Sequence, residues 1–237
     1  MAKQLGYACI NMTLAKQGIS CNRSMIRRTF DSKGVAYASE LILENLRNLT
    51  KIVSWNNQNN IKVYRMSSDM MPWMSEYELT DLPDFDKISN LLRGIGKLAM
   101  DNGQRLSFHP GQFCVLASPN EEVVLNAMNE LDKSAQIMDL MGLPESRMAK
   151  INIHVGGAYG DKKAALDRFC KNFLRLQPSA QARLTVENDD KANMYSVKEL
   201  YEGIYKKTNV PIVFDFYHHK FCTGGLTEQE ALELALS

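Results

Sequence analysis

The chain has 237 residues, of which 45% are hydrophobic and 23% are charged. This composition is typical of a folded domain with a large core, and it excludes an intrinsically disordered chain. The formal net charge of +1 supplies no overall attraction to nucleic acid, so any binding of DNA would depend on a local basic surface.

Cysteine usage and hydropathy indicate the compartment. The five cysteines are an odd number, and no two of them have the Cys-x-x-Cys spacing. Reduced thiols in a cytoplasm are therefore favoured over a disulfide framework. We find no N-terminal secretory signal and no apolar run long enough to span a bilayer. We expect a cytoplasmic monomer that does not enter a membrane.

The N-terminal part begins with an apolar run at residues 4–10, which predicts a short buried strand. A loop is predicted from Asn11 to about Gly34. It contains one acidic residue, Asp31, and a basic arm of five residues: Lys16, Arg23, Arg27, Arg28 and Lys33. Two interpretations of the basic arm stay open, a solvated loop or a segment that contacts the phosphates of DNA.

The rest of the chain alternates between amphipathic stretches and short apolar runs. Apolar residues at helical spacing predict helices at residues 37–57, 85–101, 119–141, 162–176, 196–208 and 228–236. Apolar runs between them predict strands at residues 61–66, 105–109, 150–155, 183–187 and 210–215. This alternation predicts parallel strands in a single α/β domain that covers residues 1–237.

The number of strands bears on the architecture. Eight strands close a (β/α)8 TIM barrel, whereas this sequence predicts six. Six strands would leave the first and the last strand with unpaired edges. We therefore expect a TIM barrel that is truncated after about six βα units and lacks roughly two units at its C-terminal end.

Metal-competent side chains lie at the ends of the predicted strands. All four histidines are at or just after a strand end, and two carboxylates occupy equivalent positions. One such histidine alone is more often a hydrogen-bonded residue at the edge of a core. Because the carboxyl ends of parallel strands gather on one face, the group predicts a shared metal site. Its members are His109, His154, Glu187, Asp215 and His218, and the role of His219 stays open.

The chemistry of these ligands narrows the choice of ion and of reaction. Nitrogen and oxygen ligands without thiolate suit manganese, zinc, magnesium or iron. With two or more ions, the expected reaction is hydrolysis of a phosphodiester. With one ion, the same ligands would serve a hydride shift in a sugar. The ligand set alone leaves both reactions open.

Short motifs along the chain identify a family. In order they are Gly6-Tyr7-x-x-x-Asn11, Tyr64-Arg65-x-Ser67-Ser68, Ser107-x-His109-Pro110-Gly111-Gln112, Ile153-His154-x-Gly156-Gly157-x-Tyr159-Gly160, Leu184-x-x-Glu187-Asn188-Asp189 and Asp215-x-x-His218-His219. With these motifs, the sequence resembles the UV damage endonuclease family over essentially its whole length. The resemblance implies a TIM barrel with a cluster of divalent ions, usually manganese. It also implies an enzyme that nicks damaged double-stranded DNA immediately 5′ to cyclobutane dimers, 6-4 photoproducts and abasic sites.

The resemblance also implies roles for individual residues. Tyr7 and Asn11 match catalytic-site residues near the lesion and the scissile phosphate, and Glu187 matches a catalytic metal ligand. Gln112 and Phe113 match the pair that probes the duplex opposite the lesion, where relatives often have tyrosine in the second position. The remaining matches to metal ligands of the family are His109, His154, Asp215 and His218.

Two further expectations concern residues outside these matches. Arg23, Arg27 and Arg28 of the basic arm are expected to contact DNA. At Asp69 some relatives have histidine, so a metal ligand and a loop-capping aspartate are both open interpretations.

Relatives in the family continue past the last residue of this sequence, and their tail supplies further metal ligands. A complete barrel is expected to hold about two or three manganese ions, with zinc or magnesium as alternatives. This chain is expected to be inactive or weakly folded unless a longer form exists. The rival functions are an abasic-site endonuclease, a single-metal sugar isomerase and a barrel that binds DNA without cutting it. Gln112, Phe113 and the basic arm favour DNA, since a sugar site needs neither a wedge nor phosphate contacts.

Overall fold

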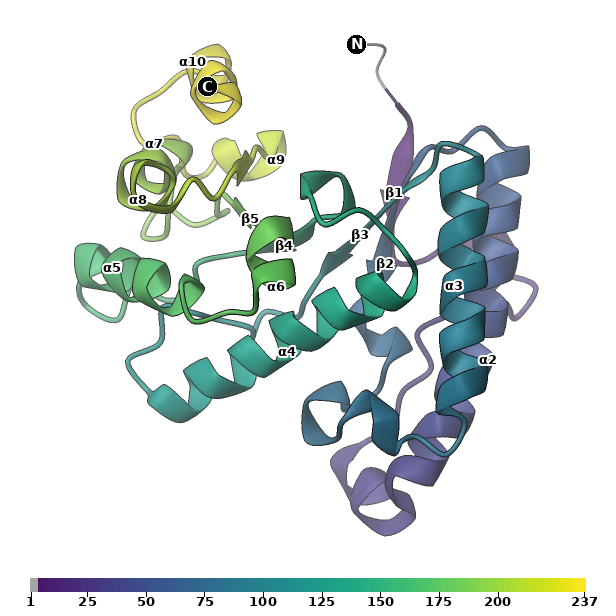
Figure 1. The fold of residues 1–237 in the computed structure, drawn as a ribbon. Coiled ribbons are helices and arrows are strands. Elements are labelled where there is room, and N and C mark those ends of the chain that lie inside the picture. Colours follow the sequence, from purple (N-terminus) through teal and green to yellow (C-terminus); the bar gives the residue numbers. More distant parts are fainter. Residues whose placement is uncertain (1–3) are drawn as a thin grey trace. The chain divides into compact units, whose positions relative to one another are not determined.

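The computed structural model describes residues 4–237, which form two compact units. The first unit consists of two segments, the described residues up to His109 and Lys133–Ala149. The second unit consists of Pro110–Asp132 and Lys150–Ser237. Helix α4 (Glu121–Leu140) contributes residues to both units. Figure 1 shows the strands and helices of both units along the chain.

All six predicted strands are present, and each lies within or close to its predicted range. The first unit contains β1 (Gly6–Ala8), β2 (Val63–Ser67) and β3 (Arg105–His109), and the second contains β4 (Ile151–Ile153), β5 (Leu184–Glu187) and β6 (Ile212–Val213). Within each unit the strands are parallel and follow one another in chain order. The carboxyl ends of the three strands in a unit therefore lie at the same edge of its sheet.

Three α-helices lie entirely within the described residues of the first unit. They are α1 (Met12–Ala15), α2 (Arg27–Gln58) and α3 (Phe85–Asp101), and α2 and α3 lie side by side in Figure 1. The core between them is apolar and fully buried, with Ile42, Leu46 and Leu49 from α2 and Leu92 and Ile95 from α3. Short 3-10 helices η1 (Ser68–Met70), η2 (Met74–Glu76) and η3 (Leu79–Asp81) connect β2 to α3.

The predicted loop from Asn11 to Gly34 is wrong in two places. Met12–Ala15 is helical, and α2 begins at Arg27, so that Arg27, Arg28 and Lys33 lie on a helix. The prediction ended at Gly34 because the helix is interrupted there, with φ 65° and ψ −161°. Glycine adopts such a positive φ without steric cost, and the chain uses it to join two helical segments.

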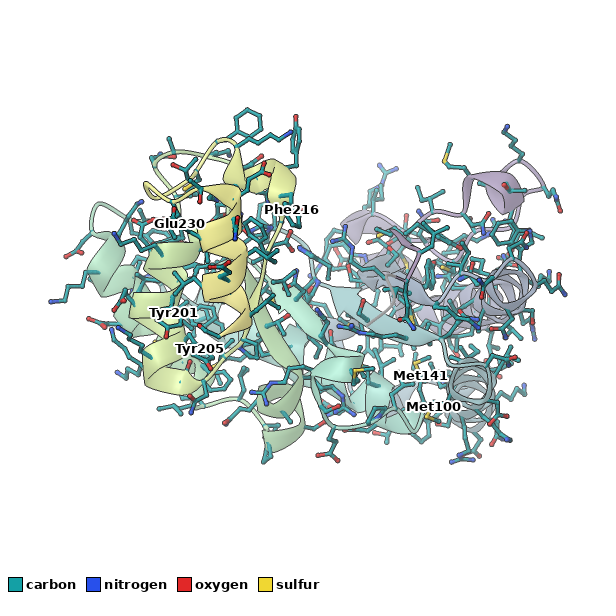
Figure 2. All side chains as sticks on the ribbon, turned by 90° about the horizontal axis from the view of Figure 1, so that it is seen from above. Met100, Met141, Tyr201, Tyr205, Phe216 and Glu230 are labelled. Atoms are coloured by element: carbon teal, nitrogen blue, oxygen red, sulfur yellow. The ribbon has the colours of Figure 1, made fainter. Side chains whose placement is uncertain are left out.

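Close packing in the first unit yields a matched pair of substitutions in α3. A Cβ added at Gly96 would lie 1.8 Å from the carbonyl oxygen of Met141, which Figure 2 labels, whereas one at Gly94 would meet no heavy atom within 4 Å. We expect Gly96→Ala to lower the free energy of unfolding by about 1–3 kcal/mol, because helix and backbone must separate. Gly94→Ala should be neutral or raise it by about 0.5–1 kcal/mol through helix propensity. Urea denaturation measures both, and equal stability of the two variants would contradict the packing argument.

The helices of the second unit are shorter. They are α5 (Lys162–Phe173), α6 (Pro178–Arg183), α7 (Val197–Leu200), the π-helix η5 (Tyr201–Tyr205), α8 (Lys206–Thr208), α9 (Phe216–His219) and α10 (Glu228–Leu236). The predicted helix at 196–208 is thus present with a π-helical middle, where Tyr201 and Tyr205 stack with ring centroids 5.3 Å apart (Figure 2). Arg183, predicted to start a strand, instead ends α6.

Two global properties follow from the described part of the chain. Across residues 4–237, every helix is either too short or too polar to cross a membrane. All five cysteines are free thiols.

Candidate metal centre

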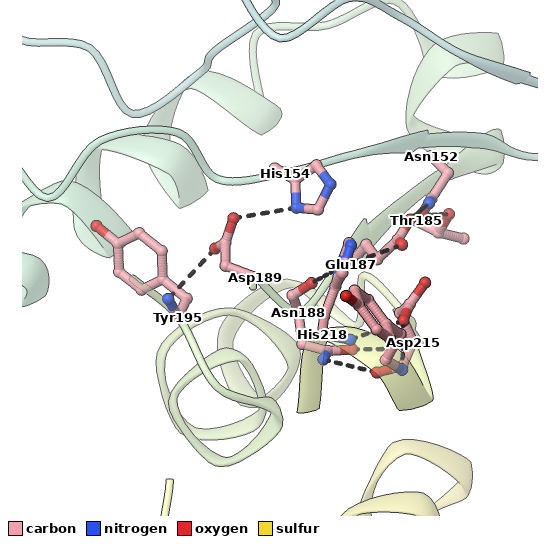
Figure 3. A network of polar contacts seen from close by, with 10 residues as sticks. Asn152, His154, Thr185, Glu187, Asn188, Asp189, Tyr195, Asp215 and His218 are labelled. Carbon is pink, nitrogen blue, oxygen red and sulfur yellow. Dashed lines mark hydrogen bonds and ion pairs between the residues drawn. The ribbon is translucent and has the colours of Figure 1, made fainter. Parts of the chain in front are cut away.

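Three of the predicted ligands come together at the strand ends of the second unit. Glu187 ends β5, Asp215 follows β6, and His218 lies in α9. Each offers one ligand atom, and these atoms all lie within 4.8 Å of one another. Figure 3 shows the surrounding network of polar contacts.

Asp215 is the residue that sets the position of His218. Its Oδ1 accepts hydrogen bonds from the backbone N–H groups of Tyr217, at 2.7 Å, and His218, at 2.9 Å, and so caps the N-terminus of α9. An aspartate with extended backbone is a favoured N-cap because it satisfies amides that have no partner in the helix. The cap places the imidazole one turn beyond the carboxylate and leaves Oδ2 for a ligand.

Asn188, which is fully buried, holds these two residues against β5. Its Oδ1 accepts from the backbone N–H of Asp215 at 2.8 Å, and its Nδ2 donates to the Asp215 carbonyl at 3.1 Å. The Asn188 carbonyl oxygen lies 2.8 Å from Nδ1 of His218. Because a carbonyl can only accept, Nδ1 carries the hydrogen and Nε2 keeps the lone pair that a metal needs. No local sequence pattern predicted this role, although Asn188 lies within the motif Glu187-Asn188-Asp189.

His154 lies beside His218, with ring centroids 5.5 Å apart. Its Nδ1 is 3.1 Å from Oδ1 of Asp189, whose other oxygen accepts the backbone N–H of Tyr195 at 3.2 Å. Burial lowers the pKa of His154, but the hydrogen bond and negative charge of Asp189 outweigh it and raise the pKa above its ordinary value. A carboxylate on one ring nitrogen orients the other toward a metal, so Asp189 is a supporting residue that sequence analysis did not assign.

The Glu187 carboxylate is only 5% exposed, and its surroundings are polar. Oε2 accepts a hydrogen bond from the side-chain amide of Asn152, and Thr185 donates to Asn152 Oδ1 at 2.8 Å. Oε1 lies on the other side, 3.7 Å from Nδ1 of His218. The sequence did contain a signal that could have identified Asn152. It is a polar residue inside a predicted strand that is otherwise apolar.

The donor set fits a divalent cation. Two carboxylates and an imidazole converge, and gathering buried negative charges costs free energy unless a positive charge compensates them. Oxygen and imidazole nitrogen donors without thiolate suit manganese, zinc, magnesium or iron. The remaining predicted ligand, His109, ends β3 in the first unit and is half-buried.

Tyr7 and Asn11 form a hydrogen-bonded pair in the first unit. The Tyr7 hydroxyl donates to Oδ1 of Asn56 at 2.7 Å and accepts from Nδ2 of Asn11 at 2.8 Å. Oδ1 of Asn11 caps α1. Burial raises the pKa of Tyr7 despite the hydrogen bonds of Asn11 and Asn56, so the phenol stays protonated at neutral pH. Asn56, fully buried on α2, was not anticipated from the sequence.

The predicted DNA-contacting residues differ in their surroundings. Phe113 is 82% exposed, and Gln112 beside it is exposed as well. Arg23 pairs with Glu44 at 3.0 Å, whereas Arg28 is exposed. Arg27 pairs with two carboxylates, Asp31 at 2.8 Å and Glu76 at 3.1 Å. Two of the five basic residues of the arm, Arg23 and Arg27, thus already have acidic partners within the first unit.

The two residues with open interpretations are also placed. Asp69 is exposed and does not cap its loop; Ser67 does, since its hydroxyl accepts the backbone N–H of Asp69 at 3.3 Å. His219 is 2% exposed, and its Nε2 lies 3.1 Å from the carbonyl oxygen of Leu226. It therefore has a packing role, unlike its neighbour His218.

Comparisons with known proteins relate this arrangement to a family. The family model described as UV-endonuclease UvdE matches residues 3–235. A putative UV-damage endonuclease of Acanthamoeba polyphaga mimivirus is 35% identical over 92% of this chain and 65% of its own length. A UV-damage endonuclease of Schizosaccharomyces pombe is 37% identical over 95% of this chain and 37% of its own length. The chain thus spans less than two thirds of these relatives.

Solved structures agree with the sequence matches. The crystal structure of SacUVDE has a TM-score of 0.86 and 33% identity, and the match covers 99% of this chain and 76% of that one. A D-psicose 3-epimerase from Clostridium cellulolyticum H10 has a TM-score of 0.58 at 14% identity, over 78% of this chain and 63% of that one, and shows the fold alone. The predicted α/β fold of the TIM-barrel type, with six βα units, is confirmed. Since the family model matches nearly the whole sequence, the chain belongs to the UV-endonuclease UvdE family.

Proposed function

We propose that this chain is a metal-dependent DNA repair endonuclease that nicks damaged double-stranded DNA 5′ to UV photoproducts. The observation that carries the proposal is the convergence of Glu187, Asp215 and His218 at one strand edge, in a family whose relatives are named UV-damage endonucleases. Cyclobutane dimers and 6-4 photoproducts are the proposed lesions, with abasic sites as a possible third class.

We assign the metal to His154, Glu187, Asp215 and His218 of the second unit. His109, at the end of β3 in the first unit, stays a ligand predicted from the sequence. Two or three manganese ions are proposed for a complete barrel, with zinc or magnesium as alternatives. When bound, such ions stabilise the charge that develops during phosphodiester hydrolysis. The chain itself contributes fixed ligand directions through Asn188 and Asp189.

Tyr7 and Asn11 are assigned to contacts near the scissile phosphate. Because the phenol of Tyr7 stays protonated, it acts through hydrogen bonds rather than as a base. The amide of Asn11 is held by both the phenol and the first turn of α1, which keeps this pair rigid before DNA arrives. Of the basic arm, Arg28 is the best placed for a phosphate, since Arg23 and Arg27 already have acidic partners.

Phe113 is assigned as the wedge that probes the duplex. We expect Phe113→Ala to weaken binding to a duplex with a single photoproduct by about 5-fold to 100-fold, since an aromatic stack is worth about 1–3 kcal/mol. Phe113→Tyr keeps the stacking face and should bind like the native chain. Fluorescence anisotropy with damaged and undamaged duplexes gives the comparison. If alanine bound damaged DNA as tightly as phenylalanine, Phe113 would not be the wedge.

The overall activity is tested by nicking of supercoiled plasmid in the presence of Mn²⁺. Plasmids that are UV-irradiated, depurinated or untreated separate a photoproduct endonuclease from an abasic-site endonuclease. Nicking of the irradiated plasmid alone or together with the depurinated one supports the proposal. Binding of irradiated DNA without any nicking would instead support a chain that recognises damage but does not cut it.

The proposal extends to the setting of the protein. A reducing, cytoplasmic location is consistent with the five free thiols of the structure. We propose a monomer, and its mass in solution is measurable by light scattering.

A further inference from the structure

Asn152 is a polar residue buried in the middle of β4. It is 5% exposed and lies between Ile151 and Ile153, which are 0% and 1% exposed. Burying an amide without hydrogen bonds costs about 1–3 kcal/mol in proteins. An apolar residue would fill this position without that cost. The hydrogen-bond partners of the amide must therefore explain its presence.

The partners of Asn152 determine which way its amide points. The Thr185 hydroxyl is 2.8 Å from Oδ1, and an amide oxygen cannot donate, so the hydroxyl gives its hydrogen to Asn152. Nδ2 then faces Glu187 and donates to Oε2, which as a carboxylate oxygen can only accept. Thr185 therefore directs the amide, and the amide directs the carboxylate (Figure 3).

Strand register explains why these three side chains meet. Asn152 is the pairing partner of Thr185 across β4 and β5, and Glu187 lies two residues further along β5. Residues two apart on a strand point to the same face, so Thr185 and Glu187 lie on one side of the sheet. We call the hydrogen-bonded series from Thr185 through Asn152 to Glu187 the relay. Its residues lie on two hydrogen-bonded strands rather than on loops, which limits their freedom to move.

We propose that Asn152 and Thr185 are positioning residues of the metal centre, which fix the direction of Oε2 of Glu187. Oε1 of the same carboxylate lies 3.7 Å from Nδ1 of His218. The amide is a neutral donor, so it holds the carboxylate without neutralising it. A lysine in the same place would compete with a cation for the negative charge. The relay thus keeps a full negative charge in a fixed direction, which is the property that raises metal affinity.

This inference rests on the metal centre of the proposed function, and binding of Mn²⁺ alone tests it without DNA. The free Mn²⁺ signal in electron paramagnetic resonance gives the affinity of the whole chain. We expect Asn152→Leu to weaken Mn²⁺ binding by about 10-fold to 100-fold, as is typical when a residue that hydrogen-bonds a metal ligand is removed. Thr185→Val, which keeps the volume and removes the hydroxyl, should weaken it in the same direction, whereas Thr185→Ser should restore near-native affinity.

A matched control comes from Thr208, whose hydroxyl donates to the carbonyl of Ile204 at 2.8 Å in a helix of the same unit. Thr208→Val removes this hydrogen bond and the one that the hydroxyl accepts from the backbone N–H of Val210 at 3.3 Å, and it should leave Mn²⁺ affinity unchanged. Thermal unfolding of the metal-free variants shows which of them are folded. If Asn152→Leu does not fold, the Mn²⁺ affinities of Thr185→Val and Thr185→Ser test the proposal instead.

The possible outcomes separate the two proposals. Folded variants of Asn152 and Thr185 with native Mn²⁺ affinity would overturn the relay while leaving the metal centre intact. A native chain that binds no Mn²⁺ would overturn both. A native chain that binds Mn²⁺ through the relay but nicks no DNA would sustain this inference and remove the proposed activity.

Discussion

Glu187→Gln is expected to reduce nicking of UV-irradiated plasmid, in a form of the protein that nicks, by about 100-fold to 1000-fold or more, a loss typical of removing one preorganised electrostatic group. Glutamine has nearly the same shape but no charge, so the cluster with Asp215 and His218 loses one of its two carboxylates. The new amide would also place a donor where Asn152 already donates, unless it turned over. Nicking rates at saturating Mn²⁺ and the metal content after dialysis provide the two readouts.

The control for this substitution is Glu202→Gln on the π-helix η5. Glu202 is an exposed carboxylate that pairs with Lys206 at 2.7 Å, away from the ligand cluster. An exposed pair of this kind contributes little to stability, so the variant should retain nicking and metal content. If Glu187→Gln behaved like Glu202→Gln, Glu187 would not be a metal ligand.

Substitution of the adjacent histidines is expected to have opposite effects. His218→Ala should abolish tight Mn²⁺ binding with little change in the free energy of unfolding of the metal-free chain, because the side chain is partly exposed and its ring serves the ligand cluster. His219→Ala should lower that free energy by about 1–3 kcal/mol while Mn²⁺ affinity stays native. Its ring is buried, contacts the Leu226 carbonyl and packs 5.3 Å from the Phe214 ring centroid.

Chemical denaturation and Mn²⁺ titration of both variants measure this pair of effects. Each histidine serves as the control for the other, since the same chemical group is removed from neighbouring positions of α9. A loss of Mn²⁺ binding on removal of His219, with native binding on removal of His218, would reverse the assignment of the two histidines.

The sequence by itself determined the order of the strands and placed the candidate ligands at their ends. Apolar runs of strand length are recognisable locally, and parallel strands necessarily bring their carboxyl ends to one edge. This is why Glu187, Asp215 and His218 could be grouped although they lie on different elements. The same use of local patterns gave a wrong loop around Gly34. A glycine often marks a loop, but Gly34 adopts a positive φ that joins two helical segments.

Only the tertiary structure decided which polar groups support the ligands. Asn152 reaches Glu187 because of the register between β4 and β5, and Asn188 reaches both Asp215 and His218 because α9 turns back onto β5. Glu44 likewise pairs with Arg23, and no sequence motif links these two distant positions. Hydrogen bonds and ion pairs depend on side-chain positions to within a fraction of an ångström, and those positions are set by long-range packing rather than by local residue patterns.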